Sequence, residues 1–237
     1  MGKLFAWLFA AGKLGKLFVS GGSMVISMFV YSLTFGWRYA VGFVLLIFFH
    51  EMGHYLAARN RGLDVGAPMF IPFVGAWIQL KDMPHNVHTE AYVGFAGPLV
   101  GTLAAIACYW IARDTDSHLM LALAYSGFML NLFNLIPISP LDGGRITAII
   151  SPKVWLIGVP LLVALFLYNP SPMLILIAIL ALPQLKAALQ KDSGAAALPE
   201  GYYDVDVNVR VNYAVFYLGL AGFLAIMSYE LHKVLQP

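Results

Sequence analysis

The 237-residue sequence has little charge and almost no cysteine. Charged residues make up only 11% of it, against roughly 25% in an ordinary soluble domain, while 60% of it is hydrophobic. A chain this apolar cannot bury its surface in water, so the lipid bilayer is its expected solvent. The single Cys108 excludes an intramolecular disulfide and a thiolate metal cluster. A formal charge of +2, with basic residues scattered through the loops, excludes a nucleic-acid-binding surface.

The apolar runs predict an all-α polytopic membrane protein that forms a single domain over residues 1–237. Seven runs are expected to span the membrane, at 18–35, 40–58, 92–112, 118–136, 154–168, 172–190 and 212–233. Proline interrupts the fifth and sixth runs, which can also form one re-entrant hairpin. The expectation is therefore six to seven transmembrane helices.

Two further segments are expected to touch the membrane without crossing it. Residues 1–17 carry Lys beside Phe and Trp, which predicts an amphipathic helix on the membrane surface. Residues 65–80 are apolar but rich in Pro and Gly, which predicts a short membrane-associated β-hairpin or loop.

The distribution of Lys and Arg predicts the orientation of the chain. On one side these residues lie in the N-terminal segment and in the loops at 59–91, 137–153 and 186–211. The loops on the opposite side hold only Arg38, Arg113 and Lys233. Because cytoplasmic loops retain positive charge, the N-terminus is expected on the cytoplasmic side of the cell's inner membrane. The second and fourth spans then end on that same side.

The motif His50-Glu51-Met52-Gly53-His54 lies near the cytoplasmic end of the second apolar run. Positions i and i+4 of an α-helix share a face, so both imidazoles can bind one metal ion. Glu51 then points to the side, where it can take a proton from water without being a ligand. The alternative makes both histidines hydrogen-bonded core residues and pairs Glu51 with a basic residue. We favour the metal site because a charged Glu at membrane depth costs roughly 2.5 kcal/mol or more.

A catalytic zinc site has three protein ligands and one open position, so a third ligand must come from elsewhere in the chain. The best candidate is Asp142, which follows Pro137 and Pro140 and precedes two glycines. Its backbone can therefore turn back toward the second span. The alternative makes Asp142 the N-cap of a short helix at this turn. Cobalt and iron also accept two His and one carboxylate, so the ligand types alone do not single out zinc.

Three motifs together resemble the site-2 protease family of intramembrane zinc metalloproteases. They are HEMGH at 50–54, GFAGPLVG at 94–101, and N-x-x-P at 134–137 followed by LDG at 141–143. The resemblance covers about residues 41–146 and implies a catalytic core there. It implies that His50, His54 and Asp142 hold one zinc ion and that Glu51 is the catalytic base. Because the loop after the second span and the C-terminal tail are short, we expect a compact member without the PDZ or CBS domain of many relatives.

Asn134, the glycines of GFAGPLVG and Arg145 lie in or next to these motifs, and each is expected to have a separate role. Asn134 occupies the position of the family's Asn, where its amide can bind the oxyanion or the substrate backbone. The alternative for Asn134 is a hydrogen bond that holds two membrane helices together. The glycines of GFAGPLVG are expected to let helices approach closely, and Arg145 is expected to anchor the chain at the membrane interface.

The expected function is hydrolysis of peptide bonds in transmembrane-segment substrates, at a site near the cytoplasmic face. The expected partners are transmembrane protein substrates and the lipid bilayer, and association of the chain with copies of itself is left open. The polar loop at 191–211 has room to act as a lid or a partner-binding element. Rival interpretations are a membrane zinc transporter and an inactive scaffold that binds membrane helices. A transporter needs further polar ligands along its path, and the runs after residue 154 offer almost none.

Overall fold

The computed structural model describes residues 2–77, 84–189 and 199–235. Helices make up most of that part of the chain, together with one small antiparallel sheet. The elements in chain order are α1 (Gly2–Phe35), α2 (Trp37–Asn60), β1 (Met69–Ile71), β2 (Gly75–Trp77), α3 (Val87–Thr115), α4 (His118–Asn134), α5 (Asp142–Ala148), the 3-10 helix η1 (Pro152–Val154), α6 (Trp155–Tyr168), α7 (Pro172–Leu189) and α8 (Val207–Leu235).

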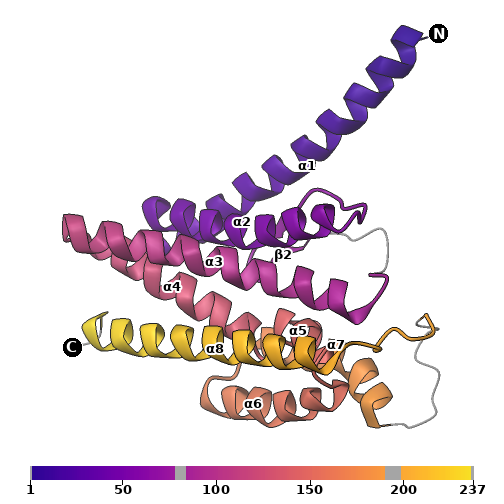
Figure 1. Cartoon of the computed structure of the whole chain (residues 1–237). Coiled ribbons are helices and arrows are strands. Elements are labelled where there is room, and N and C mark those ends of the chain that lie inside the picture. The colour runs from indigo at the N-terminus through magenta and orange to yellow at the C-terminus, as the bar shows by residue number, and fades with distance from the viewer. Residues whose placement is uncertain (1, 78–83, 190–198, 236–237) are drawn as a thin grey trace.

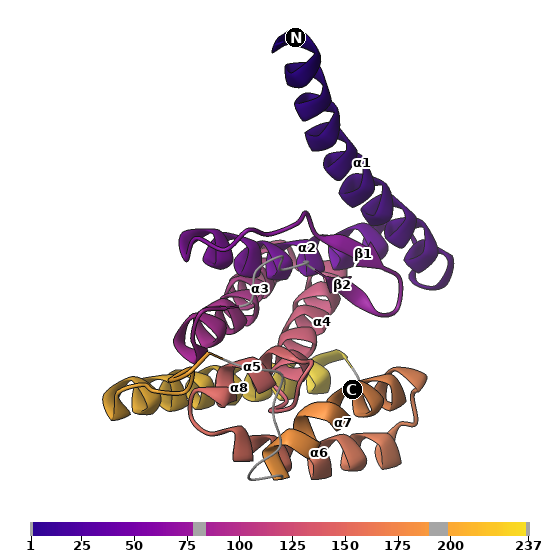
Figure 2. The same ribbon diagram turned by 90° about the vertical axis from the view of Figure 1, so that its right-hand side faces the viewer.

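Helices α2, α3 and α4 form the centre of the molecule (Figure 1). Helix α3 packs against both α2 and α4, and α1 packs against α2. Helix α8 packs against α4, while α6 and α7 pair with each other beside the short helix α5 (Figure 2). The N-terminal part of α1 extends away from the other helices in both views.

Local sequence explains where the central helices begin and end. The side chain of Asn86 accepts a hydrogen bond from the Thr89 amide at 2.8 Å and so caps α3. Ser117 caps α4 in the same way. Helix α2 begins after Gly36 and ends before Gly62, which have φ angles of 80° and 77°. Glycine adopts such positive angles without a steric penalty, so these two positions delimit the helix.

Each of the seven apolar runs that the sequence predicts as spans coincides largely with one helix, and these helices are α1 to α4 and α6 to α8. The fifth and sixth runs form two separate helices, with Pro160 inside α6 and Pro183 inside α7. Within the described residues, three helices are long and apolar enough to cross a membrane by length and composition, namely α2, α3 and α8. Shorter apolar helices occur at Val19–Phe35, Pro152–Tyr168 and Pro172–Pro183.

The N-terminal segment differs from the expectation of a separate surface helix over residues 1–17. Helix α1 runs from Gly2 to Phe35 and joins this segment to the first apolar run. Its sequence contains no proline, and a glycine in a helix interior costs only about 1 kcal/mol relative to alanine. Nothing in the local sequence therefore ends the helix before the first span begins.

The expected hairpin is present as the antiparallel pair of β1 and β2. The last residues of the predicted segment, 78–80, lie outside the described residues. Two side chains of α1 hold the hairpin in place. Ser23 Oγ accepts a hydrogen bond from the Phe70 amide at 3.1 Å, and Tyr31 Oη accepts one from the Phe73 amide at 2.9 Å. Helix α1 thus fixes the hairpin beside α2.

The chain reverses its direction between α4 and α5, over residues 135–141. This turn is tight enough that a Cβ atom on Gly143 would overlap the carbonyl of Leu135. Helix α5 starts at Asp142, with Leu141 at its N-cap position. The alternative interpretation of the sequence was therefore partly right, because Asp142 does lie in the first turn of a short helix.

The predicted polar loop covers 191–211. Its residues 199–206 fold against α3 and α5, and its residues 207–211 form the start of α8. Its earlier part, 191–198, lies outside the described residues. Tyr202 Oη donates a hydrogen bond to Glu90 Oε2 at 2.7 Å, and burial together with the Glu90 charge raises the pKa of Tyr202. Arg210 Nη1 donates to two carbonyl oxygens just beyond α5, at 2.9 and 3.0 Å. These bonds fasten the C-terminal end of α5, whose first residue enters the site described next.

Candidate metal centre

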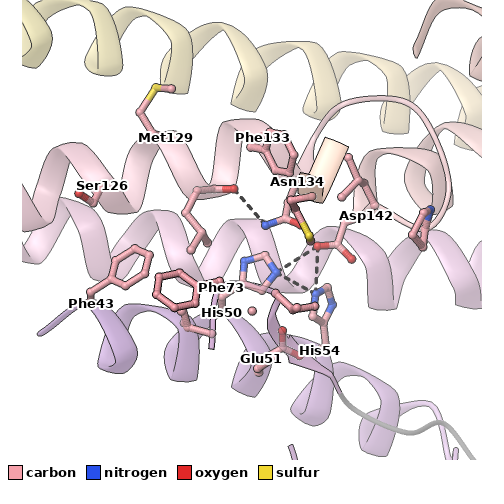
Figure 3. A pocket seen from close by; sticks show the side chains of 18 of the residues that line it. Phe43, His50, Glu51, His54, Phe73, Ser126, Met129, Phe133, Asn134 and Asp142 are labelled. Carbon is pink, nitrogen blue, oxygen red and sulfur yellow. Dashed lines mark hydrogen bonds and ion pairs between the residues drawn. The ribbon is translucent and has the colours of Figure 1, made fainter. Parts of the chain in front are cut away.

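Helix α2 brings the two histidines of the HEMGH motif to one buried face. His50 and His54 are one turn apart, and their Nε2 atoms lie 3.1 Å from each other. Both side chains point toward Asp142 (Figure 3). The two residues are only 3% and 7% exposed. Burial this deep is unusual for an imidazole unless it has a hydrogen-bond or metal partner.

Asp142 completes a group of three potential ligands. Its Oδ2 atom lies 3.1 Å from the Nε2 atom of His50 and 3.1 Å from that of His54 (Figure 3). Ligand atoms placed tetrahedrally around zinc, at bond lengths of 2.0–2.1 Å, are about 3.3 Å apart. The three observed separations agree with that spacing to a few tenths of an ångström. Two imidazoles and one carboxylate are also the kind of ligand set that zinc accepts, so these residues fit a zinc ion.

Hydrogen bonds on the far side of each ring orient the two histidines. His54 Nδ1 lies 2.7 Å from the carbonyl oxygen of Val93, which can only accept a hydrogen bond. His50 Nδ1 lies 2.8 Å from Oδ1 of Asn131. Both contacts place the ring proton on Nδ1, so each Nε2 atom has a free lone pair directed at Asp142. The sequence analysis did not identify Asn131 or the Val93 carbonyl.

The glycine motif of α3 makes room for this arrangement. A Cβ atom on Gly97 would overlap the imidazole of His54, and a Cβ atom on Gly53 of α2 would overlap the carbonyl of Ala96. The expected close approach of helices at GFAGPLVG is therefore present. Gly97 faces the imidazole of His54 directly, so no side chain fits at this position.

Glu51 follows His50 in α2 and is 8% exposed. Its side chain lies beside both imidazoles and lines the same cavity as they do (Figure 3). Within the described parts of the chain, its carboxylate makes no hydrogen bond or ion pair, and it does not belong to the group of converging ligand atoms. The carboxylate is therefore free to act on a molecule in the cavity.

The cavity beside the metal centre has a volume of about 950 Å³. Helices α2 and α4 and the strand β2 form its walls, and it extends from the metal centre to Phe43 and Ser126 (Figure 3). Asn134 lines it and donates one amide proton to the Leu130 carbonyl at 3.0 Å. Arg145, which the sequence analysis expected at the membrane interface, also lines this cavity. The cavity is large enough for several residues of an extended peptide.

Comparisons with known proteins match this part of the chain. The sequence model of peptidase family M50 matches residues 38–115. A zinc metalloprotease of Methanocaldococcus jannaschii is 34% identical over 124 residues, which are 48% of this chain and 36% of that protein. A probable chloroplast zinc metalloprotease of Arabidopsis thaliana is 22% identical over 153 residues, which are 45% of this chain and 28% of that protein. The matches thus span about a third of the length of these curated relatives.

One solved structure is also similar. The site-2 protease from Methanocaldococcus jannaschii superimposes with a TM-score of 0.47 and 21% sequence identity. The superposition covers 74% of this chain and 90% of that one.

Proposed function

We propose that the chain is an intramembrane zinc metalloprotease of peptidase family M50, because residues 38–115 match the sequence model of that family. Its substrates would be transmembrane segments of other proteins, cut near the cytoplasmic face. The observation that carries the proposal is the convergence of His50, His54 and Asp142, with the free carboxylate of Glu51 beside them.

We assign the binding of one zinc ion to His50, His54 and Asp142. Three protein ligands leave one coordination position for water or substrate, as in other catalytic zinc sites. When bound, zinc would supply a Lewis acid that polarises the scissile carbonyl and makes water more acidic. All three ligands and Glu51 come from one copy of the chain, so the proposal does not require an oligomer.

Glu51 is the proposed general base and acid. It lies at the edge of the cavity, within one residue of a ligand, and is not itself one of the converging ligands. In this role it takes a proton from the attacking water and delivers it to the leaving amine. Because water attacks directly, no covalent intermediate with the protein is expected.

Asn134 is the proposed contact for the substrate backbone or the oxyanion. One of its two amide protons is used by the Leu130 carbonyl, which holds the side chain against the cavity wall. The other amide proton and the carbonyl oxygen remain available to a peptide. A transmembrane substrate must unwind before hydrolysis, and its freed backbone groups then need such partners.

We further infer that six or seven helices cross the inner membrane of the cell, with the N-terminus in the cytoplasm. Large apolar side chains on the outer helices support this, since Leu167, Leu182 and Leu218 are exposed. The bias of Lys and Arg between alternate loops supports the orientation. A tag on the N-terminus should be degraded by added protease in inside-out vesicles and protected in right-side-out vesicles. The reverse pattern would contradict the orientation.

The proposed function is tested by incubating the purified chain with single-span membrane proteins in detergent. We expect cleavage that stops when a chelator removes the metal and returns when zinc is added. The new termini should map near the cytoplasmic end of the substrate's span. If a zinc-loaded chain cuts none of a panel of such substrates, the protease proposal fails. Zinc flux into liposomes would then separate a transporter from a scaffold.

A further inference from the structure

Asn131 of α4 contacts the imidazole of His50, and the proposed mechanism does not use it. We propose that Asn131 is a positioning residue that fixes the tautomer and the ring orientation of His50, and so sets the zinc affinity of the site. The inference rests on the proposed function in one respect, namely that zinc is the bound ion. It adds a residue that neither the motifs nor the proposed mechanism identified.

The hydrogen bonds of Asn131 determine which way its amide points. Its Nδ2 atom donates to the Gly127 carbonyl at 2.7 Å, one turn earlier in α4. Because only the amide nitrogen can donate to a carbonyl, the amide oxygen must face His50, 2.8 Å from Nδ1. That oxygen can only accept, so the proton of the imidazole lies on Nδ1. The Nε2 atom is then left with the lone pair that a metal ion requires.

Packing leaves this amide no alternative position. Asn131 is 1% exposed, which makes it one of the most deeply buried polar residues among those the structure describes. A Cβ atom on Gly101 of α3 would overlap its Oδ1 atom, so the backbone of α3 lies directly against the amide. Helix α3 on one side and the Gly127 carbonyl on the other thus hold the acceptor at a fixed place relative to His50.

The two histidines differ in whether a substitution can remove the group that orients them. His54 is oriented by the backbone carbonyl of Val93, which every residue type supplies. The equivalent partner of His50 is a side chain, so substitution can remove it without disturbing the other ligand. Asn134 provides the matched comparison, because it makes the same type of bond to the carbonyl four residues earlier. Among the described contacts, however, Asn134 has none with a histidine.

The experiment measures zinc affinity by competition with a chelator in the full-length chain, for the wild type, Asn131→Leu, Asn131→Asp and Asn134→Leu. Leu has nearly the shape of Asn but offers no acceptor, so Asn131→Leu should weaken zinc binding by about 10–100-fold. Asn131→Asp keeps the acceptor and, when protonated, the donor toward Gly127, so it should recover most of that loss. Asn134→Leu should leave zinc affinity unchanged, whatever it does to cleavage.

Two spectroscopic readouts separate positioning from a purely structural role. In the cobalt-substituted chain, Asn131→Leu should alter the visible d–d absorption bands, whereas Asn134→Leu should not. In the zinc-free wild type with ¹⁵N-labelled histidine, at a pH at which the ring is neutral, the proton of His50 should be on Nδ1. This measurement needs no variant and therefore decides the question even if Asn131→Leu does not fold.

The inference is overturned if Asn131→Leu binds zinc as tightly as the wild type, if Asn131→Asp is as weak as Asn131→Leu, or if neutral His50 carries its proton on Nε2 in the zinc-free chain. Failure of the proposed function looks different, because the wild type itself would then bind no zinc or would bind zinc and cut no substrate. Wild-type binding combined with an unaffected Asn131→Leu would contradict only the role of Asn131.

Discussion

Replacement of Glu51 by Gln is expected to lower cleavage of a single-span substrate by about 10²–10⁴-fold and to leave the bound zinc unchanged. Gln has the size of Glu but cannot take a proton from water. Zinc should remain because Glu51 is not among the ligand atoms that converge, which belong to His50, His54 and Asp142. Cleavage rate and zinc content are measured on the same purified sample, so loss of chemistry can be separated from loss of metal.

Glu230→Gln is the matched control for this substitution. Glu230 lies on α8, is exposed, and forms an ion pair with Lys233 at 3.5 Å, away from the metal centre. Its replacement should preserve both cleavage and zinc. If Glu51→Gln cuts at the wild-type rate, Glu51 is not the base. If it loses zinc, its carboxylate has a role in metal binding that the geometry does not indicate.

Gly97→Ala is expected to weaken zinc binding by at least about 10–100-fold, the range found when the support of a ligand is disturbed. The new methyl group would overlap the imidazole of His54. The His54 ring cannot move aside, because the Val93 carbonyl, which lies in α3 like Gly97, holds its Nδ1 atom at 2.7 Å. Alanine favours a helix over glycine by about 1 kcal/mol, so the backbone of α3 itself should not suffer. Zinc per chain and chelator competition measure the effect.

The matched control for Gly97→Ala is Gly219→Ala on α8, where an added Cβ atom meets nothing within 4 Å. This variant should bind zinc as the wild type does. A Gly97→Ala chain with full zinc affinity would mean that His54 does not occupy the position on which the metal centre depends. A folded Gly97→Ala chain without zinc would support the geometry described above.

The sequence was sufficient to predict the helical segments and a resemblance to intramembrane zinc metalloproteases. The comparisons match residues 38–115 to peptidase family M50 and include a 34% identical zinc metalloprotease. It also predicted which residues would meet, because the i, i+4 spacing of His50 and His54 defines a common face before any tertiary contact is known. The hairpin was predictable from Pro and Gly in an apolar segment. The roles of the individual site residues remain predictions, which the substitutions above test.

Other features depend on how the helices are rotated and packed, which a single sequence does not reveal. Asn131 and Asn134 lie three residues apart in α4, and the sequence analysis singled out Asn134 because it matches the family's motif. The structure instead puts Asn131 against His50 and leaves Asn134 at the cavity wall. The presence of Asn131 in an apolar helix was the available signal for its role, because a buried amide there needs a polar partner.

Two further differences have the same origin. Arg145 follows the glycine pair of the LDG motif, and its position in the cavity results from the turn that places α5 against α3. Asp142 was assigned two alternative roles, as the N-cap of a short helix or as a ligand, and the N-cap position is occupied by Leu141 instead. Its backbone begins α5 while its carboxylate reaches the histidines.

The most direct test of the metal centre is to count the zinc in the purified wild-type chain and to record its X-ray absorption spectrum. We expect one zinc ion per chain, nitrogen and oxygen ligand atoms at about 2.0–2.1 Å, and the outer scattering of two imidazole rings. A chain that holds no zinc after reconstitution, or a spectrum without imidazole scattering, would contradict this expectation.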